Sequence, residues 1–328
     1  MNASAGPFLV ILASLGLGLL LRRSRHLPDT APKTLNAYVI AVAVPALVLA
    51  QLPGFLRELG SHVERIDAGL VFLPLIPWLI FFGAIGFFGW LHRKGVIRRD
   101  QWALLSLSAG LGNTAFVGFP LIEALVGPRS LPLAILLDQL GTFLALSVAG
   151  TFFISYVHAT EPAAGDAPEA APKFHVDRFA RELFRFPPFL ALLASFGVAA
   201  IGTFPPIAQG VIEKLAATLV PVAMVSVGAQ LRFDRRSVGR EARGLFVGLG
   251  YKMALAPLGI ALLAYGVFRL RDEKLAVAVL EAAMAPMITS TVLGIEADFA
   301  PELGALMLGV GIPLSLLTVP LVHLFFSR

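Results

Sequence analysis

The chain has 328 residues, of which 57% are hydrophobic and only 14% are charged, and its mean hydropathy is +0.81. Soluble globular proteins carry roughly 25% charged residues, so this composition excludes a soluble domain and predicts an integral protein of the lipid bilayer. The net charge of +5 is spread over short loops, which argues against a nucleic-acid surface, and the absence of cysteine excludes disulfides and cysteine-ligated metals.

Ten apolar segments follow one another along the chain, several of them interrupted by Gly or Pro. Each is long enough to cross a hydrocarbon core of about 30 Å, so the sequence predicts an all-α membrane protein with ten transmembrane helices. The predicted spans are residues 7–21, 36–52, 69–91, 102–126, 131–157, 187–204, 207–231, 244–268, 275–296 and 302–326.

Basic residues predict how these spans are oriented. Arg22, Arg23 and Arg25 follow the first apolar segment instead of preceding it, so that segment is a membrane span and not a cleaved secretory signal. Loops on the side of residues 22–35 hold 17 of the 26 Lys and Arg residues, and loops on the other side hold 8. By the positive-inside rule, the basic loops face the cytoplasm and both termini lie outside the cytoplasmic (inner) membrane of the cell.

The fourth span contains an unusual stretch, LGNTAFVGFPLIEALVG, at residues 111–127. Gly112, Asn113, Gly118 and Pro120 stand where a membrane helix favours Leu and Ala, and both glycine and proline weaken a helix. Non-helical backbone at membrane depth is tolerated only where protein or a polar cavity satisfies its N–H and C=O groups. The sequence therefore predicts a helix break here, and the break is a candidate binding site.

A polar segment divides the chain into two halves. TEPAAGDAPEAAP, at residues 160–172, has the composition of a flexible linker, and residues 174–186 either form an amphipathic surface helix or lead into the sixth span. The predicted domains are residues 1–157, 158–186 and 187–328, with the two outer ones each forming a five-helix repeat. An odd number of spans per repeat inserts the second repeat upside down.

The ninth span has its own break, at AAMAPMITST, residues 282–291, so the fourth span of each half is interrupted. The half-helices that follow the two breaks direct free N–H groups and positive dipole ends toward a common point, which favours an anion. Alternatively, hydroxyls in membrane helices bond to their own backbone or join helices together. The candidate substrate-binding residues are Gly112, Asn113, Thr114, Gly118, Pro120, Pro286, Met287, Thr289, Ser290 and Thr291.

A few ionisable residues lie inside predicted spans, where each is costly unless it is paired or hydrated. Lys252 and Glu281 could form a buried ion pair, or Glu281 could bind a proton or cation while Lys252 attracts substrate. Asp138, followed by Gln139 in the fifth span, has the same two interpretations. These four residues are the candidates for coupling, and the sequence leaves open whether a proton, sodium or no ion is coupled.

No catalytic motif accompanies this architecture. The sequence has no HExxH, no phosphate-binding loop of Walker type and no GxSxG elbow, and its six histidines fall in loops or near span ends. We therefore expect no enzyme activity, no catalytic residues, no metal site and no cofactor, and a transporter of this kind would run on ion or substrate gradients.

Four motifs resemble the auxin efflux carrier family, which includes bacterial organic-acid permeases and plant PIN-type auxin exporters. They are GNTAFVGFPLIEALVG, VLEAAMAPMITSTVLGIEADF, LFRFPPFLALLASFG and LVPVAMVSVGAQL. The resemblance implies a fold like that of bile-acid sodium symporters and sodium/proton antiporters, with broken helices four and nine crossing at the substrate. It also implies a transport core of spans 3–5 and 8–10 that slides, elevator fashion, against scaffold spans 1, 2, 6 and 7, through which the family commonly forms homodimers.

Carried onto this sequence, the family pattern places the crossover at Asn113, Thr114, Gly118 and Pro120 and at Pro286 with Met287. Glu281 falls near the acidic position that helps to bind sodium in the bile-acid branch. Ala282 and Ala283 stand where that branch has polar partners, which argues against sodium coupling.

Three functions are consistent with these features. The first is a secondary carrier of a small organic anion, such as a dicarboxylate or an auxin-like carboxylate. The second is a sodium- or proton-coupled cation antiporter of the same fold, and the third is a membrane sensor that binds a carboxylate without moving it.

Overall fold

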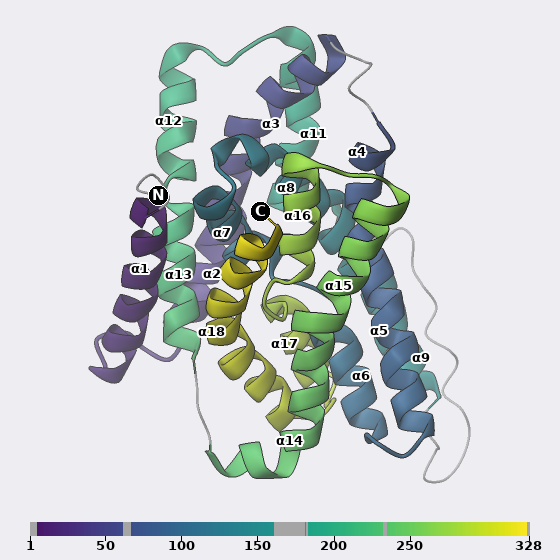
Figure 1. Cartoon of the computed structure of the whole chain (residues 1–328). Helices are drawn as coiled ribbons and strands as arrows, with labels where there is room; N and C mark the ends of the chain where they lie inside the picture. The colour runs from purple at the N-terminus through teal and green to yellow at the C-terminus, as the bar shows by residue number, and fades with distance from the viewer. Residues whose placement is uncertain (1–4, 62–66, 161–180, 182, 232–234, 327–328) are drawn as a thin grey trace.

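The computed structural model describes residues 5–61, 67–160, 181, 183–231 and 235–326, and the regular elements in this part of the chain are all helices (Figure 1). Seven of its helices are long and apolar enough to cross a membrane, which agrees with a multi-pass membrane protein. They span Gly6–Arg23, Ala31–Ser61, Ala68–Arg93, Pro128–Ala159, Pro206–Gln230, Val238–Val267 and Pro301–Phe326.

Each of the ten predicted segments lies mostly on helical residues, but three of them are not long continuous helices. The sixth is short because Pro187 and Pro188 begin α11 (Pro187–Ile201) and Gly202, with φ +142°, ends it in a conformation that favours glycine. The fourth segment divides into α6 (Arg99–Ser108) and α7 (Phe119–Leu125), and the ninth into α16 (Asp272–Ala282) and α17 (Ile288–Glu296).

Several long helices change their winding along their length, and the separate labels in Figure 1 reflect these changes. Short π-helical turns lie at Val39–Ala43, Leu137–Phe143, Ala145–Gly150, Tyr251–Leu255 and Leu262–Val267. The remaining helices are α1 (Ala5–Arg23), α2 (Ala31–Tyr38), α3 (Val44–Ser61), α4 (Ala68–Phe72), α5 (Ile76–Arg93), α8 (Leu131–Leu136), α9 (Thr151–Ala159), α12 (Pro206–Ala216), α13 (Leu219–Gln230), α14 (Arg235–Gly250), α15 (Ala256–Ala261) and α18 (Pro301–Phe326).

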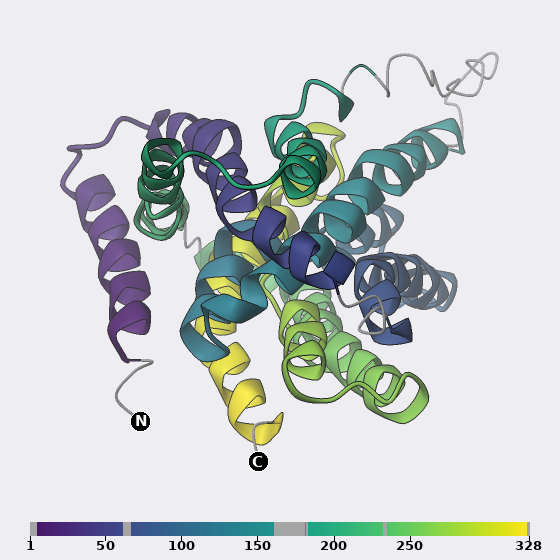
Figure 2. The same cartoon turned by 90° about the horizontal axis from the view of Figure 1, so that it is seen from above.

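Helices α1 and α13 lie side by side and cross at two glycines (Figure 1). A Cβ atom on Gly18 would lie 2.1 Å from the Val225 carbonyl oxygen, and one on Gly228 would lie 2.1 Å from the Leu15 carbonyl oxygen. Small residues that allow backbones to approach this closely are typical of helix packing in lipid. Helix α3 packs against α11 and α12, so the first, second, sixth and seventh predicted spans contact one another (Figure 2).

A second group of helices forms around α6 and α18. Helix α6 packs against α5 and α17, and α18 packs against α14 and α17. The buried interior of this group contains large apolar side chains such as Phe81, Phe88 and Phe119. The linker predicted at residues 158–186 lies largely outside the described residues, and the division into two inverted repeats stays a prediction.

Candidate functional site

The two helix breaks meet in the structure. Gly112 and Pro286 form an isolated antiparallel bridge, in which the Asn113 N–H donates to the Ala285 carbonyl at 2.8 Å and the Met287 N–H donates to the Leu111 carbonyl at 3.1 Å. Each break thus supplies hydrogen-bond partners for backbone groups that the other leaves without helical partners. This pairing satisfies the requirement that non-helical backbone at membrane depth be enclosed by protein.

The first break is organised by Asn113. Helix α6 ends at Ser108, and Asn113 starts a π-helical turn at Thr114–Gly118, where its Oδ1 accepts a hydrogen bond from the Phe116 N–H at 3.2 Å. Asn113 is only 3% exposed, and its Nδ2 is buried with no hydrogen-bond partner among the described residues. A buried amide donor without a partner costs free energy, so this group is available to a ligand.

At the second break, the hydroxyls of Ser290 and Thr291 already have hydrogen-bond partners. Ser290 Oγ donates to the Leu107 carbonyl at 3.0 Å, and Thr291 Oγ1 lies 2.9 Å from Ser108 Oγ and 2.6 Å from the Met287 carbonyl oxygen. Both hydroxyls therefore join the start of α17 to the end of α6, as the helix-joining interpretation of the sequence predicts.

A small cavity of about 60 Å³ lies at the crossing of the breaks. We call it the crossover cavity. Five of the ten predicted substrate-binding residues line it, together with Asp138 and Gln139, whereas Gly118, Pro120, Pro286, Ser290 and Thr291 do not. Its lining residues are Ile40, Val44, Gly112, Asn113, Thr114, Ala115, Phe116, Asp138, Gln139, Phe143, Phe186, Pro188, Met287, Ile288 and Thr289.

The apolar wall of this cavity was not among the residues predicted from sequence. Phe143 and Phe186 stack with ring centroids 4.0 Å apart and nearly parallel planes, and both line the cavity. The only sequence signal for this wall is Phe186 itself, which precedes Pro187 in the motif LFRFPPFLALLASFG. Residues of α2–α3, α8–α9 and α11 form this wall together, so it exists only when these distant segments pack against one another.

Asp138 belongs to the crossover cavity and is held by two neighbours. It lies in the π-helical turn Leu137–Phe143, where its Oδ1 accepts a hydrogen bond from Thr114 Oγ1 and its Oδ2 accepts one from Gln139 Nε2 at 2.7 Å. Gln139 Oε1 is buried with no hydrogen-bond partner among the described residues. Turns of this kind in membrane-buried helices are frequent at functional sites.

Lys252 and Glu281 lie on the other side of the first break. Lys252 Nζ is 3.0 Å from the position that a Cβ atom on Gly112 would occupy, and Glu281 Oε2 is 2.7 Å from the corresponding position on Gly118. Both charged groups are buried, and within the described residues neither has a hydrogen-bond partner. Glu281 lies near both Lys252 and Asp138, but among the described residues no hydrogen bond or close ion pair joins Glu281 to Lys252, which were considered from the sequence as a buried ion pair.

Two larger pockets lie in the same part of the structure, and one of them borders the crossover cavity. One, of about 630 Å³, lies between α1–α2–α13 and α17–α18 and includes Arg22, Lys33 and Asn36; we call it the Asn36 vestibule. It shares Ile40 and Ile288 with the crossover cavity, so these two side chains separate the two spaces.

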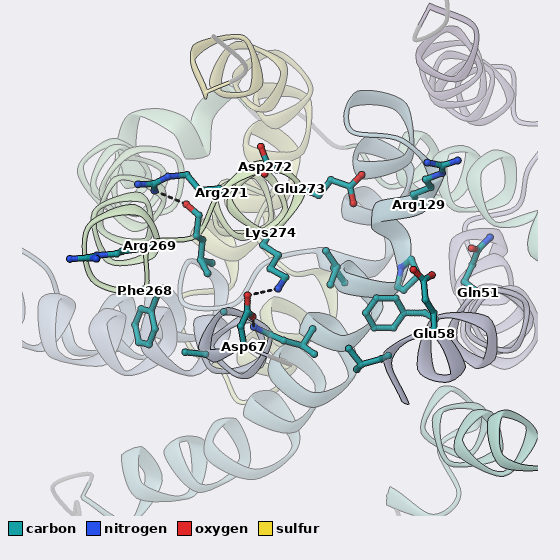
Figure 3. A pocket seen from close by; sticks show the side chains of 18 residues that line it. Gln51, Glu58, Asp67, Arg129, Phe268, Arg269, Arg271, Asp272, Glu273 and Lys274 are labelled. Atoms are coloured by element: carbon teal, nitrogen blue, oxygen red, sulfur yellow. Dashed lines mark hydrogen bonds and ion pairs between the residues drawn. The ribbon is translucent and has the colours of Figure 1, made fainter. Parts of the chain in front are cut away.

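The other pocket, of about 1180 Å³, includes four cationic side chains, Arg129, Arg269, Arg271 and Lys274, and we call it the Arg129 vestibule (Figure 3). In Figure 3, Lys274 points toward Asp67, and their Nζ and Oδ2 atoms are 2.6 Å apart. This pair joins the start of α4 to the start of α16, and no residue of the Arg129 vestibule lines the crossover cavity.

Comparisons with known proteins agree with a transporter architecture. The sequence profile of the family described as "Membrane transport protein" matches residues 5–323. An uncharacterized transporter of Methanothermobacter thermautotrophicus is 29% identical over 322 residues, which cover 97% of each chain. The chain therefore belongs to the membrane transport protein family, as its resemblance to auxin efflux carriers predicts, and it is a multi-pass membrane transporter and not an enzyme.

Proposed function

We propose that this protein is a secondary carrier of a small organic anion and that the anion binds in the crossover cavity. The observation that carries the proposal is the buried, unpartnered Nδ2 of Asn113 at the wall of that cavity. An amide donor of this kind forms a charge-assisted hydrogen bond to a carboxylate, and such bonds are stronger than neutral ones. Lys252 Nζ, which lies against Gly112, adds positive potential to the same region.

The size of the cavity favours a small aliphatic acid over an aromatic one. Because about 10–15 Å³ of such space holds one water molecule, the cavity of about 60 Å³ has room for about four to six water molecules, which is the scale of a short aliphatic acid. An indole-sized acid would require the Phe143–Phe186 stack to separate. Short mono- and dicarboxylates are therefore the first substrates to examine.

Alternating access is proposed to follow the elevator scheme. In this scheme α4–α9 and α14–α18 move together as the transport core, and α1–α3 with α11–α13 stay in place as the scaffold and form a homodimer. The boundary between the Asn36 vestibule and the crossover cavity, formed by Ile40 of the scaffold and Ile288 of the core, supports this division. We also propose that both termini lie outside the cytoplasmic membrane.

Transport of labelled acids into proteoliposomes tests the proposal. Purified protein is reconstituted, and uptake of malonate, L-malate, pyruvate and indole-3-acetate is measured with and without a preloaded unlabelled acid. The wild type is expected to exchange at least one short acid, and Asn113→Ala is expected to lose that exchange. Ser195→Ala is the matched control, because Ser195 is buried but bonds only to Ala191 within α11. Unchanged exchange by Asn113→Ala would remove the crossover cavity from the mechanism.

One observation favours a second candidate, a cation/proton antiporter. The Asp138 carboxylate lines the crossover cavity, and an ionised carboxylate in a buried cavity can carry a cation in exchange for a proton. A pH-sensitive dye inside proteoliposomes, with an imposed sodium or potassium gradient, distinguishes the two functions. Proton flux driven by the cation gradient without any organic acid would favour the antiporter.

A further inference from the structure

The crossover cavity places a carboxylate beside the proposed anion site. Asp138 and Asn113 line the same space of about 60 Å³, so a bound organic acid would hold its own carboxylate within a few atoms of Asp138. Two carboxylates that share one small buried site do not both stay ionised, because each disfavours the charged form of the other. An anion site that contains Asp138 therefore needs a means of removing one negative charge.

The groups around Asp138 do not remove this negative charge. Thr114 and Gln139 are neutral donors. Lys252, which lies against Gly112, supplies one positive charge, but Glu281 of α16 adds a second carboxylate that offsets it. In the part of the chain that the structure describes, the other neighbouring elements add no charge to this cavity: α5 directs the Trp78 indole to the Leu140 carbonyl, and α11 supplies Phe186 and Pro188. With all three charged residues ionised, the cluster has one excess negative charge before any substrate arrives.

We propose, on the basis of the proposed function, that the carrier binds its organic anion together with one proton, and that this proton resides on the Asp138 carboxyl. The proton comes from solvent and converts the Asp138 carboxylate to a carboxyl group, whose O–H becomes an additional donor to the anion. The anion and the proton then favour each other's binding by the same factor, as linkage requires. Movement of the loaded core would carry both across the membrane.

Anion binding to the full-length protein in detergent at several pH values tests this linkage. Malonate and pyruvate serve as probes between about pH 6.5 and about pH 8.5, where their carboxylates are ionised. We expect the wild-type affinity to fall about tenfold per pH unit wherever free Asp138 is ionised, because each binding event then takes up one proton. In weakly buffered solution with a pH-sensitive dye, addition of the probe should remove about one proton per bound anion.

Asp138→Asn is the principal variant, because asparagine keeps the shape of the carboxyl group and cannot titrate. We expect it to bind the probes with an affinity that does not change with pH and with no proton uptake. Ser195→Ala is the matched control: it removes a buried hydroxyl that bonds to Ala191 within α11, and we expect it to keep the tenfold dependence per pH unit. Size-exclusion chromatography of each variant establishes that the protein is folded.

The outcomes separate this inference from the proposed function. A wild type that binds an anion without proton uptake would overturn the linkage and leave the carrier proposal intact, whether or not the Asp138→Asn protein folds. A pH dependence that survives in Asp138→Asn would place the proton elsewhere and would also overturn the inference. A folded wild type that binds none of the probes at any pH would remove the proposed function and the linkage with it.

Discussion

The two helix breaks contain similar polar residues, but the side chains of these residues differ in their hydrogen bonds. At the first break, Asn113 uses its oxygen to start the π-helical turn and leaves its amide nitrogen buried without a partner among the described residues. At the second break, Ser290 and Thr291 both give their hydroxyls to groups at the end of α6. The first break thus retains a donor for a ligand, whereas the Ser290 and Thr291 hydroxyls of the second hold the crossing together.

This difference shows that residue type alone does not identify a binding group in a membrane helix. A hydroxyl in the first turn of α17 can reach the carbonyl of its own helix or the neighbouring helix, so it is satisfied locally. An amide has both an acceptor and donors, and at Asn113 the local turn uses only the acceptor. Substitutions at the two breaks therefore separate ligand binding from the joining of helices.

Asn113→Asp should have the largest effect on binding. Aspartate keeps an oxygen that can accept from the Phe116 N–H, but it removes the amide donor and adds a negative charge at the cavity. A hydrogen bond to a charged group contributes about 1.5–3 kcal/mol, so anion affinity should fall by about ten- to a hundredfold or more. The buried carboxylate should also lower the melting temperature without ligand, so the loss of affinity is measured as ligand-induced thermal stabilisation relative to each protein's own melting temperature without ligand. An unaltered affinity would show that the free donor is not used.

The double variant Ser290→Ala, Thr291→Val should have the opposite profile. It removes two side-chain links between α17 and α6, each contributing about 1 kcal/mol, so the free energy of unfolding should fall by about 2 kcal/mol. Anion affinity in the folded protein should stay close to that of the wild type. Chemical unfolding in detergent measures the stability, and a large loss of affinity with unchanged stability would reverse the roles assigned to the two breaks.

Asp67→Asn should have the smallest effect and provides a comparison at a helix start remote from the crossover cavity. Asp67 caps α4 through the Leu70 N–H and pairs with Lys274. Burial alone would raise the pKa of Asp67, but the hydrogen bonds from Lys274 and the Leu70 backbone outweigh it and lower the pKa below its ordinary value.

Asparagine preserves this cap and removes the charge, and because the pair is exposed, it should cost at most about 1 kcal/mol of stability at neutral pH. A carboxyl group with a lowered pKa stabilises the folded state above its ordinary pKa of about 3.9 and loses that contribution as the pH falls through the lowered value. The difference between wild type and variant should therefore disappear in that acidic range. A difference that persists there would assign the effect to packing.

The sequence predicted the helical membrane class and the positions of both breaks, because proline, glycine and Asn113 interrupt otherwise continuous apolar segments. It also indicated that the breaks meet, since the predicted inverted arrangement would bring them to one point. It could not distinguish Asn113 and Thr289, which line the cavity, from Ser290 and Thr291, which do not, because neighbouring residues on one helix face different partners. The Phe143–Phe186 wall and the unpaired state of Lys252 and Glu281 likewise depend on contacts between distant segments.

In the proposed mechanism, the donor left free at the first break binds the transported anion. Exchange of a labelled short acid, measured side by side in proteoliposomes containing wild type, Asn113→Asp or the Ser290→Ala, Thr291→Val protein, tests it most directly. We predict that the Asn113→Asp protein loses exchange while the double variant retains it once the amounts of folded protein are matched. Exchange that persists in Asn113→Asp and disappears in the double variant would contradict the account.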